Sequence, residues 1–211
     1  MRQAISQRPM VVTLLGLALI ALLLMARPAS AATTPTDTVK GAIDQVIASL
    51  QGHSLAREER WASIGRIIND RFDFRSMSQS VLATNWQDAT SEEKRQFVEY
   101  FSQYLEDTYR TKIESYSDQR VEYLAEQVRK DRATVDTAVV TTDKRIPISY
   151  RLKLTKGKWV AYDVVIEGVS LVNNYRSTFS AIVKAGGMDG LLTDLEGRIS
   201  KYKLKHGGLP Q

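Results

Sequence analysis

The stretch IPISYRLKL, residues 146–154, decides the fold class of this chain. Its even-numbered positions are apolar, whereas its odd-numbered positions hold proline or polar residues. This period of two is typical of a β-strand with one buried and one solvated face. The turn sequence Thr155-Lys156-Gly157-Lys158 follows, and residues 159–166 form a second predicted strand. We therefore expect an antiparallel hairpin whose first strand presents a continuous apolar face.

Two further strands are predicted upstream, over residues 121–128 and 133–141, which completes a four-stranded meander. Helical periodicity precedes the meander and returns after it. The strongest local helix signal is Thr90-Ser91-Glu92-Glu93, a capping box that opens the longest predicted helix, about residues 92–116. Because an apolar sheet face must be covered, we predict an α+β fold with helices packed on one face of a four-stranded antiparallel sheet.

The first 31 residues have the pattern of an export signal. Arg2 and Arg8 precede an uninterrupted apolar run over residues 10–26, and Ala29-Ser30-Ala31 offers a small-residue cleavage site. An uncleaved membrane anchor is the alternative, although the run is short for a spanning helix. We predict cleavage after Ala31, which leaves residues 32–211 as a single domain. The absence of cysteine excludes lipoprotein anchoring and disulfides, as is ordinary for a bacterial envelope protein.

The charge balance argues against nucleic acid as a partner. The full chain carries 29 basic and 24 acidic residues, a formal net charge of +5. Three arginines and no acidic residue fall within residues 1–31, so the remainder has 26 basic residues, 24 acidic ones and a net charge of +2. Nucleic-acid binders usually show a much stronger basic stripe. The lysines at 201, 203 and 205 form too short a cluster for stable membrane anchoring, so only weak direct membrane binding is expected.

The usual catalytic and metal-binding motifs are missing from the sequence. The two histidines, His53 and His206, lie in polar, loop-like contexts. Asp163 and Glu167 form a pair of acids, but an ion pair with Arg176 or a nearby lysine is the simpler interpretation. We therefore predict that the protein is not an enzyme. The alternatives are an enzyme of the same fold with Asp163 in its cavity, and a protein-binding module with a solidly packed interior.

Residues 159–172, WVAYDVVIEGVSLV, are similar to the signature of the MlaC family, the periplasmic phospholipid-binding proteins also called the toluene-tolerance family. The resemblance continues in Asn174-Tyr175-Arg176 and in residues 187–191. Upstream, the segment Phe72-Asp73-Phe74 resembles the family's other block, together with Met77, Val81, Leu82 and Trp86. In this order and spacing the matches cover nearly the whole chain after the signal.

The resemblance implies a nuclear-transport-factor-like or cystatin-like fold and a soluble shuttle for phospholipid in the periplasm. It further implies exchange with an inner-membrane MCE-domain ABC transporter complex and with an outer-membrane lipoprotein–porin complex, which maintains outer-membrane lipid asymmetry. Related carriers of hopanoids or other envelope lipids share the fold, so the lipid class stays open.

The predicted site is an apolar pocket for acyl chains, with phospholipid as cargo and no cofactor. Two chains of about fifteen methylenes represent roughly 24 kcal/mol of apolar burial, at about 0.8 kcal/mol per methylene, which requires a deep cavity. Tyrosines of the long helix suit its wall, although their pattern alone fits an ordinary core better. No cluster of arginines suggests a phosphate clamp, so headgroups should contribute little. The predicted lining is Tyr104, Leu105 and Tyr109 from the long helix, Ile148, Tyr150 and Leu152 from the strand over 146–154, and Val164, Ile166 and Val169 near the end of the next strand.

Overall fold

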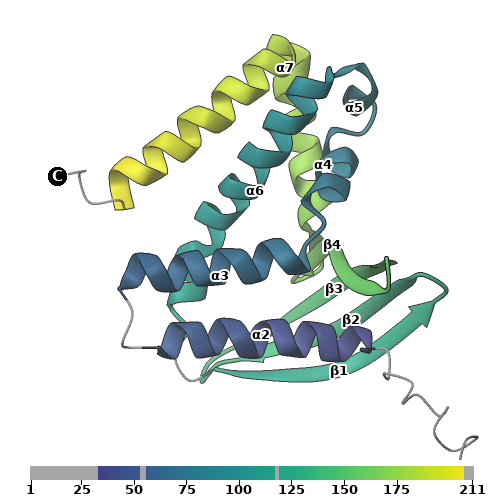
Figure 1. Cartoon of the computed structure of the whole chain (residues 1–211), viewed down its shortest axis with the longest axis vertical. Coiled ribbons are helices and arrows are strands. Elements are labelled where there is room, and N and C mark those ends of the chain that lie inside the picture. Colours follow the sequence, from purple (N-terminus) through teal and green to yellow (C-terminus); the bar gives the residue numbers. More distant parts are fainter. Residues whose placement is uncertain (1–32, 53–55, 117–118, 207–211) are drawn as a thin grey trace, which may run out of the picture. The chain divides into compact units, whose positions relative to one another are not determined.

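The computed structural model describes residues 33–52, 56–116 and 119–206. The predicted signal and His53 lie outside these ranges. Within them the chain runs through helices, a sheet and a last long helix (Figure 1). The helices are α2 (Pro35–Gln51), α3 (Arg57–Arg71), α4 (Phe74–Leu82), α5 (Asn85–Asp88), α6 (Ser91–Glu114) and α7 (Leu171–His206). The strands are β1 (Arg120–Arg129), β2 (Arg132–Val140), β3 (Arg145–Thr155), β4 (Lys158–Ile166) and β5 (Val169–Ser170). No helix in the described ranges is long and apolar enough to cross a membrane.

Local sequence explains where the longest helices begin and bend. The predicted capping box at α6 is confirmed, since the Thr90 hydroxyl accepts from the Glu93 amide and the Glu93 carboxylate accepts from the Thr90 amide. α7 is two helices joined at Gly187, whose φ of 69° lies in the left-handed region that glycine adopts without a Cβ clash. The chain therefore changes direction sharply at Gly187, inside one element.

The sheet is antiparallel with the order β1-β2-β3-β4-β5, which confirms the α+β fold class. Its strand count corrects the prediction of four. Val169, which was expected near the end of the fourth strand, instead pairs with Ile166 from a fifth strand, β5. The reason lies in Glu167 and Gly168, which both have positive φ, 50° and 82°. Two such residues form the tight turn of a β-hairpin, so the chain folds back along β4 before α7 begins.

Residues 74–88 form two helices rather than one. α4 ends at Leu82, α5 begins at Asn85, and Ala83 between them has a φ of 52° and a ψ of −118°. A non-glycine residue in this region carries backbone strain. Trp86 is nevertheless buried on α5.

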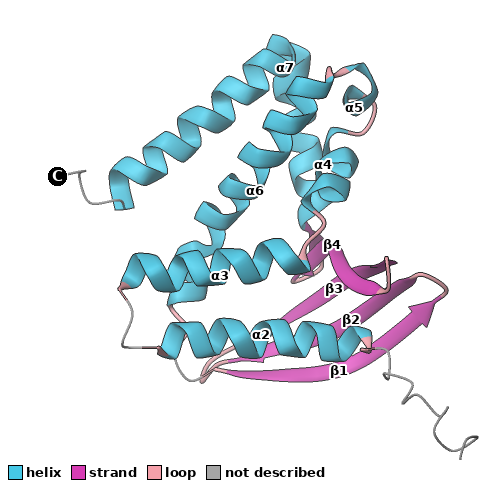
Figure 2. Ribbon diagram, in the orientation of Figure 1, coloured by secondary structure: helices cyan, strands magenta, loops and turns pink. Residues whose placement is uncertain are grey.

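Apolar side chains gather in two clusters rather than one. The helical cluster lies among α4, α5, α6 and α7, and the sheet cluster lies between α2 and the strands. Figure 2 shows the strands as one layer with α2 along it, while α4, α6 and α7 are grouped away from the sheet. The buried residues of the helical cluster are Met77, Val81, Leu82, Trp86, Phe97, Phe101, Leu105, Val172, Tyr175, Phe179, Leu191, Leu192 and Leu195. Those of the sheet cluster are Val39, Ala133, Val135 and Leu152, with Ile43, Tyr123, Tyr150 and Trp159 packed against them.

Strand β4 joins the helical part to the sheet. At one point Phe72 pairs with Ala161, and the Asp73 amide donates to the Ala161 carbonyl at 2.8 Å. The Asp73 carboxylate then pairs with Lys153 of β3 and accepts from the Ser76 amide at the start of α4. These contacts hold α4 against the edge of the sheet. A second link between helices and sheet is made by Asp163 of β4, which accepts from the Val172 amide at the start of α7.

Candidate functional site

Six of the nine predicted lining residues lie on one face of the sheet. Ile148 pairs with Ile166, Tyr150 pairs with Val164, and Ile166 pairs with Val169. Side chains of paired residues lie on the same face, and alternate residues of β3 share it, so Leu152 belongs to the same surface. We call this surface the apolar sheet face; it consists of Ile148, Tyr150, Leu152, Val164, Ile166 and Val169.

The apolar sheet face is covered unevenly. At one end Leu152 is 1% exposed and packs with Val39 of α2. Toward the other end Ile148 and Ile166 are half-buried, and Val169 is 55% exposed. Helix α2 therefore covers the end of the face at Leu152, whereas apolar side chains around β5 remain open to contact.

Neighbouring strands supply further residues that the sequence prediction omitted. Val135 pairs with Tyr150 and Thr137 with Ile148, which places both on the apolar sheet face. The Thr137 hydroxyl donates to the Ile148 carbonyl at 2.9 Å, so this polar group is satisfied within the sheet. Thr137 could have been found only from the register of the two strands, because a threonine in isolation is not an apolar signal.

The two tyrosines on this face, Tyr123 and Tyr150, have raised pKa values. Burial, with a smaller contribution from the neighbouring Tyr123, raises the pKa of Tyr150 to about 12. Burial also raises the pKa of Tyr123 to about 12. Both phenols are therefore uncharged at physiological pH. A tyrosine in this state offers an apolar ring with a single polar tip, which is compatible with a hydrocarbon ligand.

The other three predicted residues, Tyr104, Leu105 and Tyr109, belong to the helical cluster. Leu105 is 7% exposed and is a full member of that cluster. The Tyr104 ring packs edge-on against Tyr175 of α7, with centroids 5.7 Å apart. Burial raises the pKa of Tyr109, whose hydroxyl interacts with that of Tyr175. These side chains thus pack against α7, and the structure does not bring them into one cluster with the apolar sheet face.

Two cavities lie elsewhere in the described part of the chain, and none of the nine predicted residues lines either one. One, of about 240 Å³, lies where α2, α3 and α6 meet and has Leu50, Trp61 and Ile64 on its apolar side. The other, of about 510 Å³, lies beside the β3–β4 turn.

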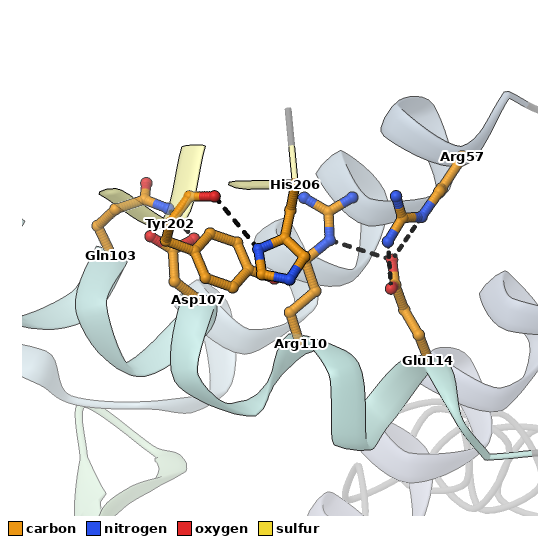
Figure 3. Close-up of polar contacts among 7 residues, drawn as sticks. All are labelled: Arg57, Gln103, Asp107, Arg110, Glu114, Tyr202 and His206. Carbon is orange, nitrogen blue, oxygen red and sulfur yellow. Dashed lines mark hydrogen bonds and ion pairs between the residues drawn. The ribbon is translucent and has the colours of Figure 1, made fainter. Parts of the chain in front are cut away.

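Two arginines share the Glu114 carboxylate at the first cavity (Figure 3). Glu114 accepts from Arg57 at 2.7 Å and from Arg110 at 3.0 Å, and the Arg110 guanidinium lies 4.8 Å from the centre of the Trp61 ring. These contacts hold the pKa of Glu114 below its usual value despite partial burial, which acts in the opposite direction. Arg57 and Arg110 are thus already committed to a carboxylate and do not form a preorganised phosphate clamp.

A buried carboxylate with one unpartnered oxygen lies nearer the start of α6 (Figure 3). Asp107 is 6% exposed; its Oδ1 accepts from Gln103 at 2.9 Å, but its Oδ2 is buried without a hydrogen-bond partner. Burial raises the pKa of this carboxyl, although Lys203, Arg110 and His206 act to lower it. His206 itself stacks on Tyr202, and its Nδ1 lies 3.2 Å from the Tyr202 carbonyl oxygen. No group of three potential metal ligands occurs among the described residues.

Asp163, the acid considered for catalysis, has a structural role. It is 3% exposed, pairs with Arg151 at 2.9 Å, and accepts from the Ser170 hydroxyl and the Val172 amide. The expected partner was Arg176 or a lysine, but Arg176 instead donates to the Ser80 carbonyl. Through these three hydrogen bonds, Asp163 fixes the first turn of α7 to β4 and β5.

Comparison with known proteins identifies the family. The sequence model of the MlaC protein family matches residues 40–197. The chain belongs to the MlaC family. It is 24% identical over 183 residues to the intermembrane phospholipid transport system binding protein MlaC of Haemophilus influenzae, covering 82% of this chain and 86% of that protein. It is also 24% identical over 196 residues to the toluene tolerance protein ttg2D of Pseudomonas putida, covering 86% and 88% of the two chains.

A solved member of this structural group carries a ligand. The phospholipid-binding protein from Ralstonia solanacearum, determined in complex with a phospholipid, superposes on this MlaC-family chain with a TM-score of 0.72. The two are 26% identical, and the match covers 78% of this chain and 96% of the other. The expected resemblance to the MlaC family is therefore confirmed.

Proposed function

We propose that this protein is a periplasmic carrier that binds a phospholipid by its acyl chains against the apolar sheet face. The observation that carries the proposal is membership of the MlaC family together with a solved relative that holds a phospholipid. The incompletely covered apolar surface around Ile148, Ile166 and Val169 offers a place for hydrocarbon. Adding a ligand there would complete a core that α2 covers only in part.

The α6 residues Tyr104 and Tyr109 would form the opposite wall after a rearrangement. In the structure they pack with Tyr175, and these contacts would loosen for acyl chains to insert between α6 and the sheet. Removing a phospholipid from a bilayer forfeits roughly 24 kcal/mol of chain burial, on the estimate of about 0.8 kcal/mol per methylene. Spontaneous extraction would then be slow.

Membrane-bound partners therefore belong to the proposal. One is an inner-membrane MCE-domain ABC transporter complex and the other an outer-membrane lipoprotein–porin complex, between which the carrier would exchange lipid and so maintain outer-membrane asymmetry. At the α2–α3–α6 cavity, Arg57 and Arg110 already form ion pairs with Glu114. This supports recognition of the lipid through its acyl chains rather than through its headgroup. Asp163 supports binding over catalysis, because its carboxylate is held in a structural network.

Native mass spectrometry tests the proposal. The full chain should be expressed for export to a bacterial periplasm and purified there, as residues 32–211, without detergent. This protein should carry phospholipid. Lipids with different headgroups but equal chains should be retained to similar extents. Protein that is folded yet lipid-free, and that acquires no phospholipid from vesicles in the presence of mild detergent, would contradict a carrier function. A co-purifying hopanoid would support a carrier function but would show that the cargo is not phospholipid.

A further inference from the structure

The groove beside the β3–β4 turn combines an apolar floor with a polar rim. It has a volume of about 510 Å³ and is lined on its apolar side by Phe72, Phe74 and Val160. The two phenyl rings stack with centroids 5.9 Å apart, and all three side chains are half-buried. The groove is thus wide enough to admit a side chain and is already floored by aromatic surface.

Basic side chains without acidic partners stand on its rim. Lys156 and Lys158 are exposed and line the groove, and in the described ranges no carboxylate lies within ion-pair distance of either. Asp70 and Asp73 also line the groove, but each already has a basic partner, because Asp73 pairs with Lys153 and Asp70 lies 3.5 Å from Arg71. The rim of the groove is therefore a region of uncompensated positive charge.

The neighbouring β1–β2 turn extends this charge. The Leu154 amide donates to the Asp131 carbonyl at 2.8 Å, which holds the two turns together at one end of the sheet. Arg129, Lys130 and Arg132 of that turn are exposed, and Asp131 is the single acid among them. We call the groove and these two basic turns the hairpin surface.

The hairpin surface and the apolar sheet face lie on opposite sides of the sheet. Thr155 and Lys153 alternate with Leu154 and Leu152 along β3, so the groove side of the strand is turned away from the apolar sheet face. A molecule bound in the groove would therefore leave that face accessible. A lipid carrier requires this separation, since its cargo must move while the partner is attached.

We propose that the hairpin surface docks an acidic protein partner, which inserts one apolar side chain against Phe72, Phe74 and Val160. The inference rests on the proposed carrier function, because it assigns a contact surface to a partner that the carrier needs. The concave shape favours a protein, since a protruding side chain fills a depression. A membrane would instead require apolar residues at the turn tips, which here are Lys156-Gly157 and Lys130-Asp131.

The probe is a synthetic glutamate-rich peptide with a central phenylalanine, titrated into the isotopically labelled protein and followed by NMR amide shifts. We expect saturable shifts at Phe72, Phe74 and Val160, and a dissociation constant at least roughly tenfold higher for K156E/K158E. The matched control is K201E/K205E, which makes the same charge change on the exposed end of α7 and should leave binding unchanged. A peptide with alanine in place of phenylalanine should bind more weakly.

Shifts that are absent, that lie away from the groove, or that K201E/K205E reduces as much as K156E/K158E would overturn the proposal. Equal shifts with phosphatidylglycerol vesicles would assign the surface to a membrane instead. Native mass spectrometry of K156E/K158E separates the two proposals, because its lipid content should equal that of the unmodified protein. If the unmodified protein carries no lipid and acquires none from vesicles, the carrier function fails, while the peptide titration still decides whether the groove docks an acidic partner.

Discussion

The helical cluster and the apolar sheet face differ in how completely they are buried. Phe97 and Phe101 have no exposed surface, and their rings stack with centroids 5.5 Å apart. On the sheet, Ile148 is half-buried and Val169 is 55% exposed. The helical cluster is thus a closely packed core, whereas the apolar sheet face is only partly covered by other elements. We therefore expect folding to depend on the first region and, under the proposed function, ligand binding to depend on the second.

The largest expected effect is in the helical cluster. Phe101→Ala should lower the free energy of unfolding by about 3–5 kcal/mol, because a fully buried ring leaves a cavity among Phe97, Tyr175 and Phe179. Urea denaturation measures the loss. Lipid content per folded molecule should stay the same.

In contrast, Ile148→Ala on the sheet should lower the free energy of unfolding by less than about 1.5 kcal/mol and should reduce lipid content. Reversed outcomes for the two variants would remove the distinction between core and binding surface.

Val169→Glu should separate lipid binding from folding. The side chain is largely exposed, so stability should change by less than about 1 kcal/mol. A carboxylate beside Ile166 would have to be desolvated by an acyl chain, so retained phospholipid should fall to about a tenth of the usual level or less. Native mass spectrometry measures the occupancy. The matched control is Leu204→Glu, which alters a residue 81% exposed on α7 and should keep its lipid. Unchanged lipid in a folded Val169→Glu protein would count against this site.

Asp107 gives the helical region a predictable pH dependence. Burial raises the pKa of its carboxyl in the folded state above the ordinary value of 3.8, so ionisation disfavours folding. The stability of the unmodified protein relative to Asp107→Asn should therefore decrease as pH rises from about 3.8 through the raised folded pKa. Urea denaturation at a series of pH values measures the difference. A relative stability that increases with pH would mean that Lys203, Arg110 and His206 outweigh burial.

The smallest expected effect concerns backbone strain at Ala83. Its φ of 52° suits glycine, so Ala83→Gly should raise stability by about 0.5–1 kcal/mol once the greater entropy of the unfolded chain is included. Ala181→Gly, at an exposed position inside the helical part of α7, should instead lower stability by about 1 kcal/mol. Thermal unfolding of both variants provides the comparison. Equal destabilisation would show that Ala83 is not strained.

The sequence predicted features that depend on local pattern. The alternation in residues 146–154 gave the strand and its apolar face, and the capping box at Thr90 gave the start of α6. β5 was missed because its turn uses Glu167 at a positive φ, which composition does not reveal. Tyr104 and Tyr109 were correctly expected to face inward, but helical periodicity does not identify the surface that they face. That surface is α7, whose two halves are redirected at Gly187.

A phospholipid with a photoreactive group in its acyl chain tests the central claim most directly. After loading and irradiation, peptide mass spectrometry should locate the cross-links on Ile148, Tyr150, Ile166 and Val169 of the apolar sheet face. Labelling confined to Phe97, Phe101 and Phe179 of the helical cluster, or to the hairpin surface, would contradict the assignment of the sheet as the lipid-binding region.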